Sequence, residues 1–162
     1  MIQMRRFHPQ DASQIAQLFH DTIRQVNLGD YTLAQVQAWA PDDLNFRDWV
    51  TACSARITYV ADDDGVIAGF GELEANGHID CFYCHKDYQG QGVGRQIYQT
   101  IERKALDLSL PRLFLEASIT ARPFFEHMGL VMLKEQRVFR RGQYLTNFVM
   151  EKWLSDNPST RL

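Results

Sequence analysis

The chain has 162 residues, of which 45% are hydrophobic and 23% are charged, and its formal net charge at pH 7 is −3. This length suits one domain with a substantial core, which we place at residues 1–154, followed by a frayed tail at residues 155–162. No basic cluster is longer than Arg140-Arg141, which disfavours a nucleic-acid partner. Neither a membrane-spanning apolar run nor a signal-peptide pattern occurs, so we expect a cytoplasmic protein without a membrane partner.

The first third of the chain has mainly helical patterning. Apolar residues recur at helical spacing after Asp11, which is a good N-cap, and Gly29 is a plausible stop. Thr32 and Gln35 form a capping box at the start of a second helix, and Pro41 prevents its continuation. We predict a strand at residues 2–7, then helices at 11–29, at 32–39 and from 42 or 43 to about 52.

From residue 56 the hydrophobic period changes to that of strands. Asp64-Gly65 and Asn76-Gly77 mark turns between them, and Gly129 ends a short helix. We predict strands at residues 56–61, 66–74, 78–84, 113–117, 130–140 and 144–153, with one helix following residue 94 and another at 121–128. The fourth of these strands should run beside the third.

The corner that follows the strand at residues 78–84 is the most informative stretch. Glycines at positions 90, 92 and 94 remove the Cβ atoms that would keep a ligand off the backbone, and they permit positive φ. The amides of Gln91 to Arg95 can then point outward together at the start of a helix, where N–H groups lack partners and partial positive charge accumulates. Such a corner can hold a phosphate or diphosphate, and Arg95 adds a full charge.

Two common phosphate-binding motifs do not fit this corner. The dinucleotide fingerprint needs a glycine where Arg95 stands, and the P-loop needs a Gly-Lys-Ser/Thr sequence that is absent. The spacing Gln89-x-x-Gly92-x-Gly94 instead resembles the Q/R-x-x-G-x-G/A signature of the GNAT superfamily of N-acyltransferases. The alternative is a plain glycine-rich turn that caps a helix.

A second segment extends the resemblance. Residues 117–130 are similar to the family's N-x-x-A-x-x-L-Y-x-K-x-G-F stretch, with Ala121, Gly129 and Leu130 at matching positions. This segment, with residues 136–138 and 146–148, is especially similar to the YafP-like branch of bacterial acetyltransferases. The resemblance covers nearly the whole chain. It implies the α/β (α+β) GNAT fold, which has a mixed central sheet of about seven strands flanked by helices.

The resemblance implies acetyl-CoA as co-substrate. Its diphosphate should lie on the amides of the glycine corner, and no metal is needed because backbone dipoles and Arg95 offset the charge. In the family, the pantetheine arm adds to the open strand edge where the strands at 78–84 and 113–117 diverge. The residues expected to bind acetyl-CoA are Phe82, Tyr83, Cys84, Gln89, Gly90, Gln91, Gly92, Val93, Gly94, Arg95, Ser118 and Phe125.

The resemblance also implies acetyl transfer to a primary amine of a small molecule or peptide, by direct attack in a ternary complex. A protonated amine has no lone pair, so a base must remove its proton. Asp80 is the first candidate, because a carboxylate in an otherwise apolar strand should either face the cleft or have a buried partner such as an arginine. Glu72 and Glu74 are further candidates, and an N–H near Tyr83 or Cys84 would stabilise the oxyanion.

The chain departs from the family pattern at two positions. Phe125 stands where many members carry a tyrosine that protonates the departing thiolate, so Tyr83, Tyr144 or water would have to supply the proton. Ser118 stands where the family often has an asparagine that contacts the pantetheine arm. The missing tyrosine leaves open a second function, a non-catalytic acyl-CoA-binding module.

Metal binding and acceptor choice are the remaining questions. Cys81-x-x-Cys84 looks like half a metal site, but residues three apart on a strand point to opposite faces, so we predict no metal. Acidic residues between positions 30 and 48 would suit a cationic amine. The final strand is apolar enough for either core or a dimer contact, so both a monomer and a homodimer fit the sequence.

Overall fold

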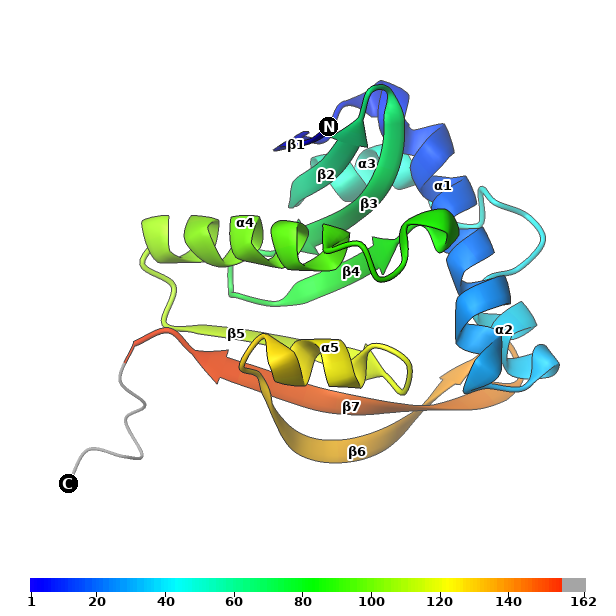
Figure 1. Cartoon of the computed structure of the whole chain (residues 1–162). Coiled ribbons are helices and arrows are strands. Elements are labelled where there is room, and N and C mark those ends of the chain that lie inside the picture. Colours follow the sequence, from blue (N-terminus) through cyan, green and yellow to red (C-terminus); the bar gives the residue numbers. More distant parts are fainter. Residues whose placement is uncertain (156–162) are drawn as a thin grey trace.

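The computed structural model describes residues 1–155 and arranges them as two β-sheets with helices packed against them (Figure 1). The strand orders are β1-β2-β3-β4 and β5-β7-β6. The strands are β1 (Ile2–Arg6), β2 (Ile57–Asp63), β3 (Val66–Leu73), β4 (Ile79–Cys84), β5 (Arg112–Ser118), β6 (Val131–Arg140) and β7 (Gln143–Trp153). The mixed α/β fold is confirmed, with its seven strands divided between two sheets. The tail predicted at residues 155–162 lies, except for Ser155, outside the described residues.

The α-helices of the described part are α1 (Ala12–Asp21), α2 (Leu33–Trp39), α3 (Trp49–Ser54), α4 (Val93–Asp107) and α5 (Arg122–His127). The predicted capping box is present, because Thr32 and Gln35 accept hydrogen bonds from each other's backbone N–H at 3.1 and 2.9 Å. The third helix starts later than predicted. Asp48 caps it by accepting from the Thr51 N–H at 3.1 Å, and the preceding residues form a loop. No helix within residues 1–155 combines the length and apolarity that crossing a membrane requires.

The helix predicted at residues 11–29 changes character halfway. After α1 the chain continues as a π-helical turn, Thr22–Val26, and then as a 3-10 turn, Asn27–Gly29. Such π turns are frequent at functional sites. This one places the Thr22 hydroxyl where it donates to the Cys84 carbonyl oxygen at 2.8 Å, which ties the helix to the end of β4.

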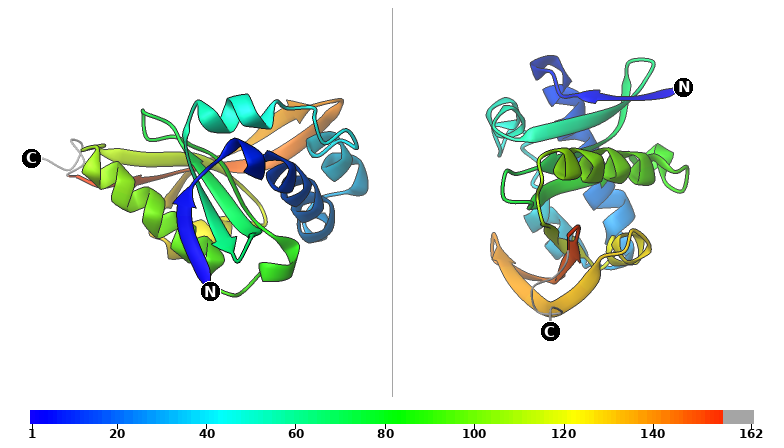
Figure 2. Two further views of the ribbon diagram at one scale, coloured as in Figure 1. Left: turned by 90° about the horizontal axis from the view of Figure 1, so that it is seen from above. Right: turned by 90° about the vertical axis from the view of Figure 1, so that its left-hand side faces the viewer.

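The two sheets touch at one end and then separate (Figure 1), and the right view of Figure 2 shows one sheet above the other. His78 and Phe114 form a single parallel bridge, and the Phe114 N–H donates to the Gly77 carbonyl at 3.1 Å. A Cβ on Gly77 would lie 2.1 Å from the Arg112 carbonyl oxygen, so only glycine fits this crossing. The prediction that β5 runs beside β4 is therefore correct only at this bridge. Beyond it, β5 pairs along its whole length with β7 instead.

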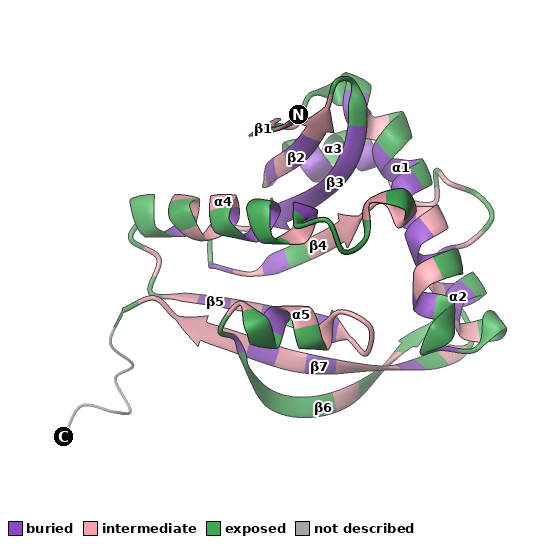
Figure 3. Cartoon of the chain, viewed as in Figure 1, coloured by how far each residue is buried: buried purple, intermediate pink, exposed green. Residues whose placement is uncertain are grey.

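The core consists of two clusters on opposite faces of the first sheet. One cluster packs around α4 and the second sheet, and the other packs under α1 and α3. Cys84 belongs to the first cluster and Cys81 to the second, so the two sulfurs lie on opposite faces, as strand alternation predicted. Figure 3 shows buried residues along β3 and on the inner face of α4, whereas β6 is largely exposed. The apolar final strand, β7, lies between β5 and β6.

Candidate active site

The corner between β4 and α4 has the geometry that the glycines predicted. Gly90 and Gly92 have φ values of +72° and +81°, which residues with a side chain rarely adopt, and Gly92 is the N-cap of α4. Gly94 is needed for a different reason. A Cβ there would lie 3.1 Å from the Phe124 ring and 3.4 Å from the Cys84 sulfur. The first N–H groups of α4, which have no intrahelical acceptor, can therefore be approached closely by a ligand.

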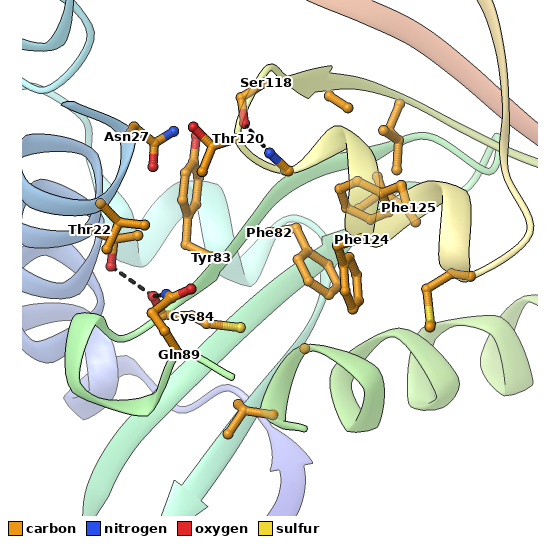
Figure 4. A pocket seen from close by; sticks show the side chains of 18 of the residues that line it. Thr22, Asn27, Phe82, Tyr83, Cys84, Gln89, Ser118, Thr120, Phe124 and Phe125 are labelled. Carbon is orange, nitrogen blue, oxygen red and sulfur yellow. Dashed lines mark hydrogen bonds between the residues drawn. The ribbon is translucent and has the colours of Figure 1, made fainter. Parts of the chain in front are cut away.

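A cavity of about 490 Å³ follows this corner into the gap between β4 and β5 (Figure 4). We call it the loop cavity. It is lined by the π-helical turn, the end of β4, the corner itself, the end of β5 and α5. All the residues predicted to bind acetyl-CoA line this cavity except Gln91, whose side chain turns away and donates to the Asp87 carbonyl at 3.2 Å. The structure thus brings the predicted residues together at one site.

The free edge of β4 is directed into the loop cavity. The His85 N–H donates to the Ala68 carbonyl of β3 at 2.8 Å. Because successive residues of a strand direct their N–H groups to opposite sides, the Cys84 N–H points away from β3, into the gap. The Cys84 carbonyl accepts from Thr22 at 2.8 Å and from the Gln89 side chain at 2.9 Å. Gln89 therefore anchors the glycine corner to β4.

The loop cavity has an apolar wall and a thiol. Phe82 packs against Phe124 and Phe125, with ring centroids 5.5 and 5.2 Å away. Phe125 is buried and supplies no hydroxyl at the position where many family members have a tyrosine. Burial raises the pKa of the Cys84 thiol to about 11, so this thiol is protonated at neutral pH and is a poor nucleophile.

A second cavity of about 310 Å³ lies against the β6–β7 hairpin, and we call it the hairpin cavity. Aromatic side chains from separate segments form much of its wall: Phe19, Tyr31, Trp39, Phe46 and Tyr83. The two cavities adjoin at a set of shared residues that we call the junction: Trp39, Asp80, Tyr83, Glu116 and Ser118. A group bound in one cavity can therefore meet a group bound in the other.

Asp80 lies at the junction with about one third of its side chain exposed (34%). Its Oδ2 is 3.1 Å from an Arg56 nitrogen and 3.4 Å from an Arg47 nitrogen. The sequence left two alternatives for Asp80, a carboxylate that faces the cleft and one that pairs with arginine. In the structure Asp80 does both. The arginines fix the carboxylate in position beside both cavities.

Glu72 and Glu74, the other candidate bases, line neither cavity. Glu72 is fully buried and accepts two hydrogen bonds from Arg47 at 3.0 Å, while the Cys53 thiol donates to it at 3.3 Å. Glu74 lies 2.7 Å from His78. We therefore carry neither residue into the proposed mechanism. The contacts of Glu72 indicate a structural role, because a buried carboxylate requires such partners.

Glu116 is a junction carboxylate that the sequence analysis missed. Its Oε2 lies 2.8 Å from Nε2 of His78, whose Nδ1 lies 2.7 Å from Glu74. The hydrogen bond to Glu116, together with the one to Glu74, outweighs burial and raises the pKa of His78 to about 9. His78 is therefore protonated at neutral pH. An isolated carboxylate in an apolar strand, the signal that singled out Asp80, also applied to Glu116.

Tyr83 is the tyrosine that lies at the junction. Its ring packs edge-on against Phe19 at 5.0 Å, and burial raises its pKa well above 10, so the phenol stays protonated. Tyr144, the other tyrosine considered as a proton donor, is 57% exposed and lines neither cavity. Ser118 also lies at the junction, where its hydroxyl accepts from the Ala121 N–H at 3.0 Å.

Two groups of potential metal ligands lie close to the junction. Their carboxylates already contact positive charges, since Arg47 and Arg56 contact Asp80 and the protonated His78 contacts Glu74. Such cations oppose a metal ion at the same place. The groups are Glu72 with Asp80 and Cys81, and Glu74 with His78 and Asp80, each with ligand atoms within 4.8 Å of one another.

Comparison with known proteins identifies the class to which this fold and site belong. A family model described as "Acetyltransferase (GNAT) domain" matches residues 27–152, and the chain belongs to this family. It is therefore a GNAT acetyltransferase. A similar relative is YafP of Escherichia coli (strain K12), described as an uncharacterized N-acetyltransferase. The two are 30% identical over 150 residues, which span 92% of this chain and 94% of YafP.

Solved structures agree with this assignment. A GCN5-related N-acetyltransferase (aminotransferase, class II) from Rhodopseudomonas palustris has a TM-score of 0.88 at 33% identity, covering 95% of this chain and 96% of its own. PaiA N-acetyltransferase from Thermoplasma acidophilum, in complex with coenzyme A, has a TM-score of 0.72 at 15% identity. That match covers 94% of this chain and 99% of PaiA, and it shows a shared fold.

Proposed function

We propose that this protein transfers an acetyl group from acetyl-CoA directly to a primary amine of a small molecule or peptide, in a ternary complex. The observation that carries the proposal is the junction, where the loop cavity and the hairpin cavity share Asp80 and Tyr83. One cavity offers the helix N-terminus and open strand edge that suit a pyrophosphorylated thiol carrier, and PaiA binds coenzyme A on the same fold. The other cavity offers room for an acceptor.

The residues of the loop cavity supply the interactions that acetyl-CoA needs. The first amides of α4 and the Arg95 side chain would bind the diphosphate without a metal. The open edge of β4 would hydrogen-bond the amides of the pantetheine arm. The Cys84 N–H would then donate to the thioester carbonyl and stabilise its developing negative charge.

Two junction side chains would handle protons. Asp80, held by Arg47 and Arg56, would accept the proton of the attacking amine directly or through water. Tyr83 would donate a hydrogen bond to the departing sulfur. Because burial raises its pKa, Tyr83 is a weaker acid than the leaving thiol, so it stabilises the thiolate without giving up its proton completely.

The cysteines favour direct attack over an acetyl-enzyme intermediate. Cys84 lines the loop cavity and Cys81 lines the hairpin cavity. Burial raises the pKa of Cys84 to about 11 and that of Cys81 well above its usual value, so both remain protonated. A thiol must ionise to become a good nucleophile. The acceptor amine is therefore the expected nucleophile.

Calorimetry with acetyl-CoA, combined with a thiol-release assay over a panel of amines, tests the proposal. We expect acetyl-CoA to bind and at least one amine to release free thiol. Asp80→Asn should lower kcat about a hundredfold or more without changing the affinity for acetyl-CoA. Asp42→Asn is the matched control, because Asp42 pairs with Arg24 and lines neither cavity. Binding without thiol release from any amine would instead identify a non-catalytic acyl-CoA-binding module.

A further inference from the structure

At the junction end of the hairpin cavity the cations Arg47 and His78 are paired with carboxylates, whereas the opposite end carries arginines without such partners among residues 1–155. The carboxylates of the cavity, Asp80 and Glu116, lie at the junction, whereas Arg140 and Arg141 line only the hairpin cavity. Arg140 pairs with Gln143 of β7. The junction residue Ser118 pairs with Asn147, four positions further along the same strand. At roughly 3.3 Å per residue, this is about 13 Å along β7, and Arg140 and Ser118 also lie on opposite sides of that strand.

The two arginines at the hairpin tip carry charges that no residue among 1–155 neutralises by an ion pair. Arg141 donates to the Ala38 carbonyl at 2.8 Å, and its guanidinium lies 4.9 Å from the centre of the Phe46 ring. Arg140 donates to the Phe139 carbonyl at 3.0 Å. Each guanidinium has five donor hydrogens, so most remain free for a carboxylate or another anion.

Arg47 also lines the hairpin cavity, but its charge is neutralised by carboxylates of the protein. Both of its terminal nitrogens donate to Glu72 at 3.0 Å, and one also lies 3.4 Å from Asp80. Its charge is therefore used within the protein. The arginines available to a ligand are those at the hairpin tip.

The acidic residues that were expected to attract a cationic acceptor do not line the hairpin cavity. Asp42 pairs with Arg24 at 2.7 Å, and Asp48 caps α3. Asp30 accepts a hydrogen bond from Thr120 at 2.8 Å. These contacts use the carboxylates within the protein, so they no longer support the expectation of a cationic amine.

The middle of the hairpin cavity suits a flat or apolar body. Tyr31 and Trp39 pack edge to face with centroids 5.3 Å apart. The Tyr31 hydroxyl is fixed in place, since it donates to the Thr146 carbonyl at 2.6 Å and accepts from the Ile119 N–H at 2.9 Å. A cavity of about 310 Å³ is near the lower end of small-molecule sites, which favours a small molecule.

Asn147 supplies a further polar group in this cavity. Its Oδ1 is buried and has no hydrogen-bond partner among the described residues. A buried carbonyl oxygen without a partner is uncommon in folded proteins. Because this oxygen has almost no accessible surface, we assign it no contact with the acceptor.

From this arrangement we propose that the acceptor is a small amine that also carries an anionic group on an apolar or aromatic body. It binds in the hairpin cavity with the anion at Arg140 and Arg141 and the amine at the junction. This inference rests on the proposed function and names its substrate class. The amine nitrogen forms a C–N bond to the acetyl carbon while the C–S bond breaks and its electron pair stays on sulfur. One amine proton ends on the thiol, and an amine that starts protonated releases a second proton to solvent.

Matched pairs of amines test the proposal in the thiol-release assay. 4-(Aminomethyl)benzoate is compared with 4-(aminomethyl)benzamide, and 6-aminohexanoate with 6-aminohexanamide, because a spacer must separate the amine from the anion to span the cavity. The phosphonate analogue of 4-(aminomethyl)benzoate distinguishes carboxylate from other anions, and spermidine represents cationic acceptors. In every pair with measurable turnover, we expect the anionic member to have a kcat/KM at least about tenfold higher, as a direct guanidinium–anion pair implies. We also expect 3-phenylpropionate, which has the anion but no amine, to inhibit competitively against the acceptor.

The double variant Arg140→Gln/Arg141→Gln should reduce this preference to less than about threefold and leave acetyl-CoA binding unchanged. Arg137→Gln is the matched control, because Arg137 lies on the same strand but stacks on Tyr144, at 5.3 Å, outside both cavities. The inference is overturned if the neutral members of the pairs or spermidine are acetylated as well as the anionic amines, or if the double variant keeps the preference. Absence of thiol release with every amine would overturn the proposed function itself.

Discussion

The loop cavity and the hairpin cavity are built in different ways. The loop cavity depends on main-chain groups from one continuous stretch, the end of β4 and the corner that leads into α4. The hairpin cavity depends on side chains from α1, α2, the loop before α3, β4, β5 and the β6–β7 hairpin. A carrier that is common to a whole family can be bound by backbone geometry. An acceptor that is particular to one protein needs side chains, and these must be assembled by the whole fold.

The largest predicted effect is on the support of the hairpin cavity. Arg47→Met should lower the free energy of unfolding by about 3–5 kcal/mol, because it leaves the buried Glu72 without the partner that donates two hydrogen bonds to it. Arg56 lies 3.8 Å from Glu72 and provides only a longer contact. Urea denaturation monitored by circular dichroism measures the change.

Two further variants show whether this loss comes from an unpaired charge. Arg47→Met/Glu72→Met should recover more than half of the lost stability, because it removes both charges. Arg140→Met, which changes an exposed arginine of the same cavity, should alter the free energy of unfolding by no more than about 0.5 kcal/mol. A loss below about 1 kcal/mol for Arg47→Met would show that Glu72 does not depend on Arg47.

The second largest predicted effect is on the pH dependence of stability, and it comes from His78 at the bridge where the two sheets meet. Hydrogen bonds to Glu116 and Glu74 raise the pKa of His78 from 6.5 to about 9. Because the pKa is higher in the folded state, the stabilisation is complete below pH 6.5 and is lost as the pH rises to about 9. It amounts to at most about 3 kcal/mol. The free energy of unfolding of His78→Gln should lack this pH dependence, and parallel profiles for the two proteins would contradict the prediction.

The third effect is confined to the loop cavity. Gly94→Leu should weaken acetyl-CoA binding at least about tenfold, or about 1.4 kcal/mol, because its side chain would meet Phe124 where the ligand approaches the backbone. Binding of 3-phenylpropionate in the hairpin cavity should be unchanged. Gly29→Ala is the control, since a Cβ there meets no atom within 4 Å. Equal acetyl-CoA affinity in calorimetry would show that the corner does not bind the carrier.

Local patterns predicted most of the fold, and the errors have physical causes. The hydrophobic period continues through Val26, so it could not reveal that the helix becomes a π turn at Thr22. Asp43 has the sequence context of a helix cap, yet its side chain accepts from the Asn45 N–H at 2.9 Å and closes a turn. The helix cap is Asp48 instead. Caps and turns use the same side chains, so spacing alone does not separate them.

The predictions for the candidate site also depended on whether the feature is set by consecutive residues or by the packing of distant ones. Glycine spacing located the corner of the loop cavity because its geometry is set by consecutive residues. Strand patterning placed Glu72 near the cleft but could not show that Arg47, 25 positions away, pairs with it. The sequence analysis gave Arg140 and Arg141 no role in a site. Their position at one end of a cavity depends on how the hairpin packs against α2.

The open edge of β4 also has a consequence for solubility. An unpaired strand edge is usually a risk, because a strand from another molecule can add to it and start aggregation. Here the gap beside β4 lies between α4 and α5, which flank it on either side (Figure 1). These helices obstruct a foreign sheet, whereas a thin ligand can enter lengthwise. The recess would therefore leave this edge open to the proposed ligand while limiting fibre-like association.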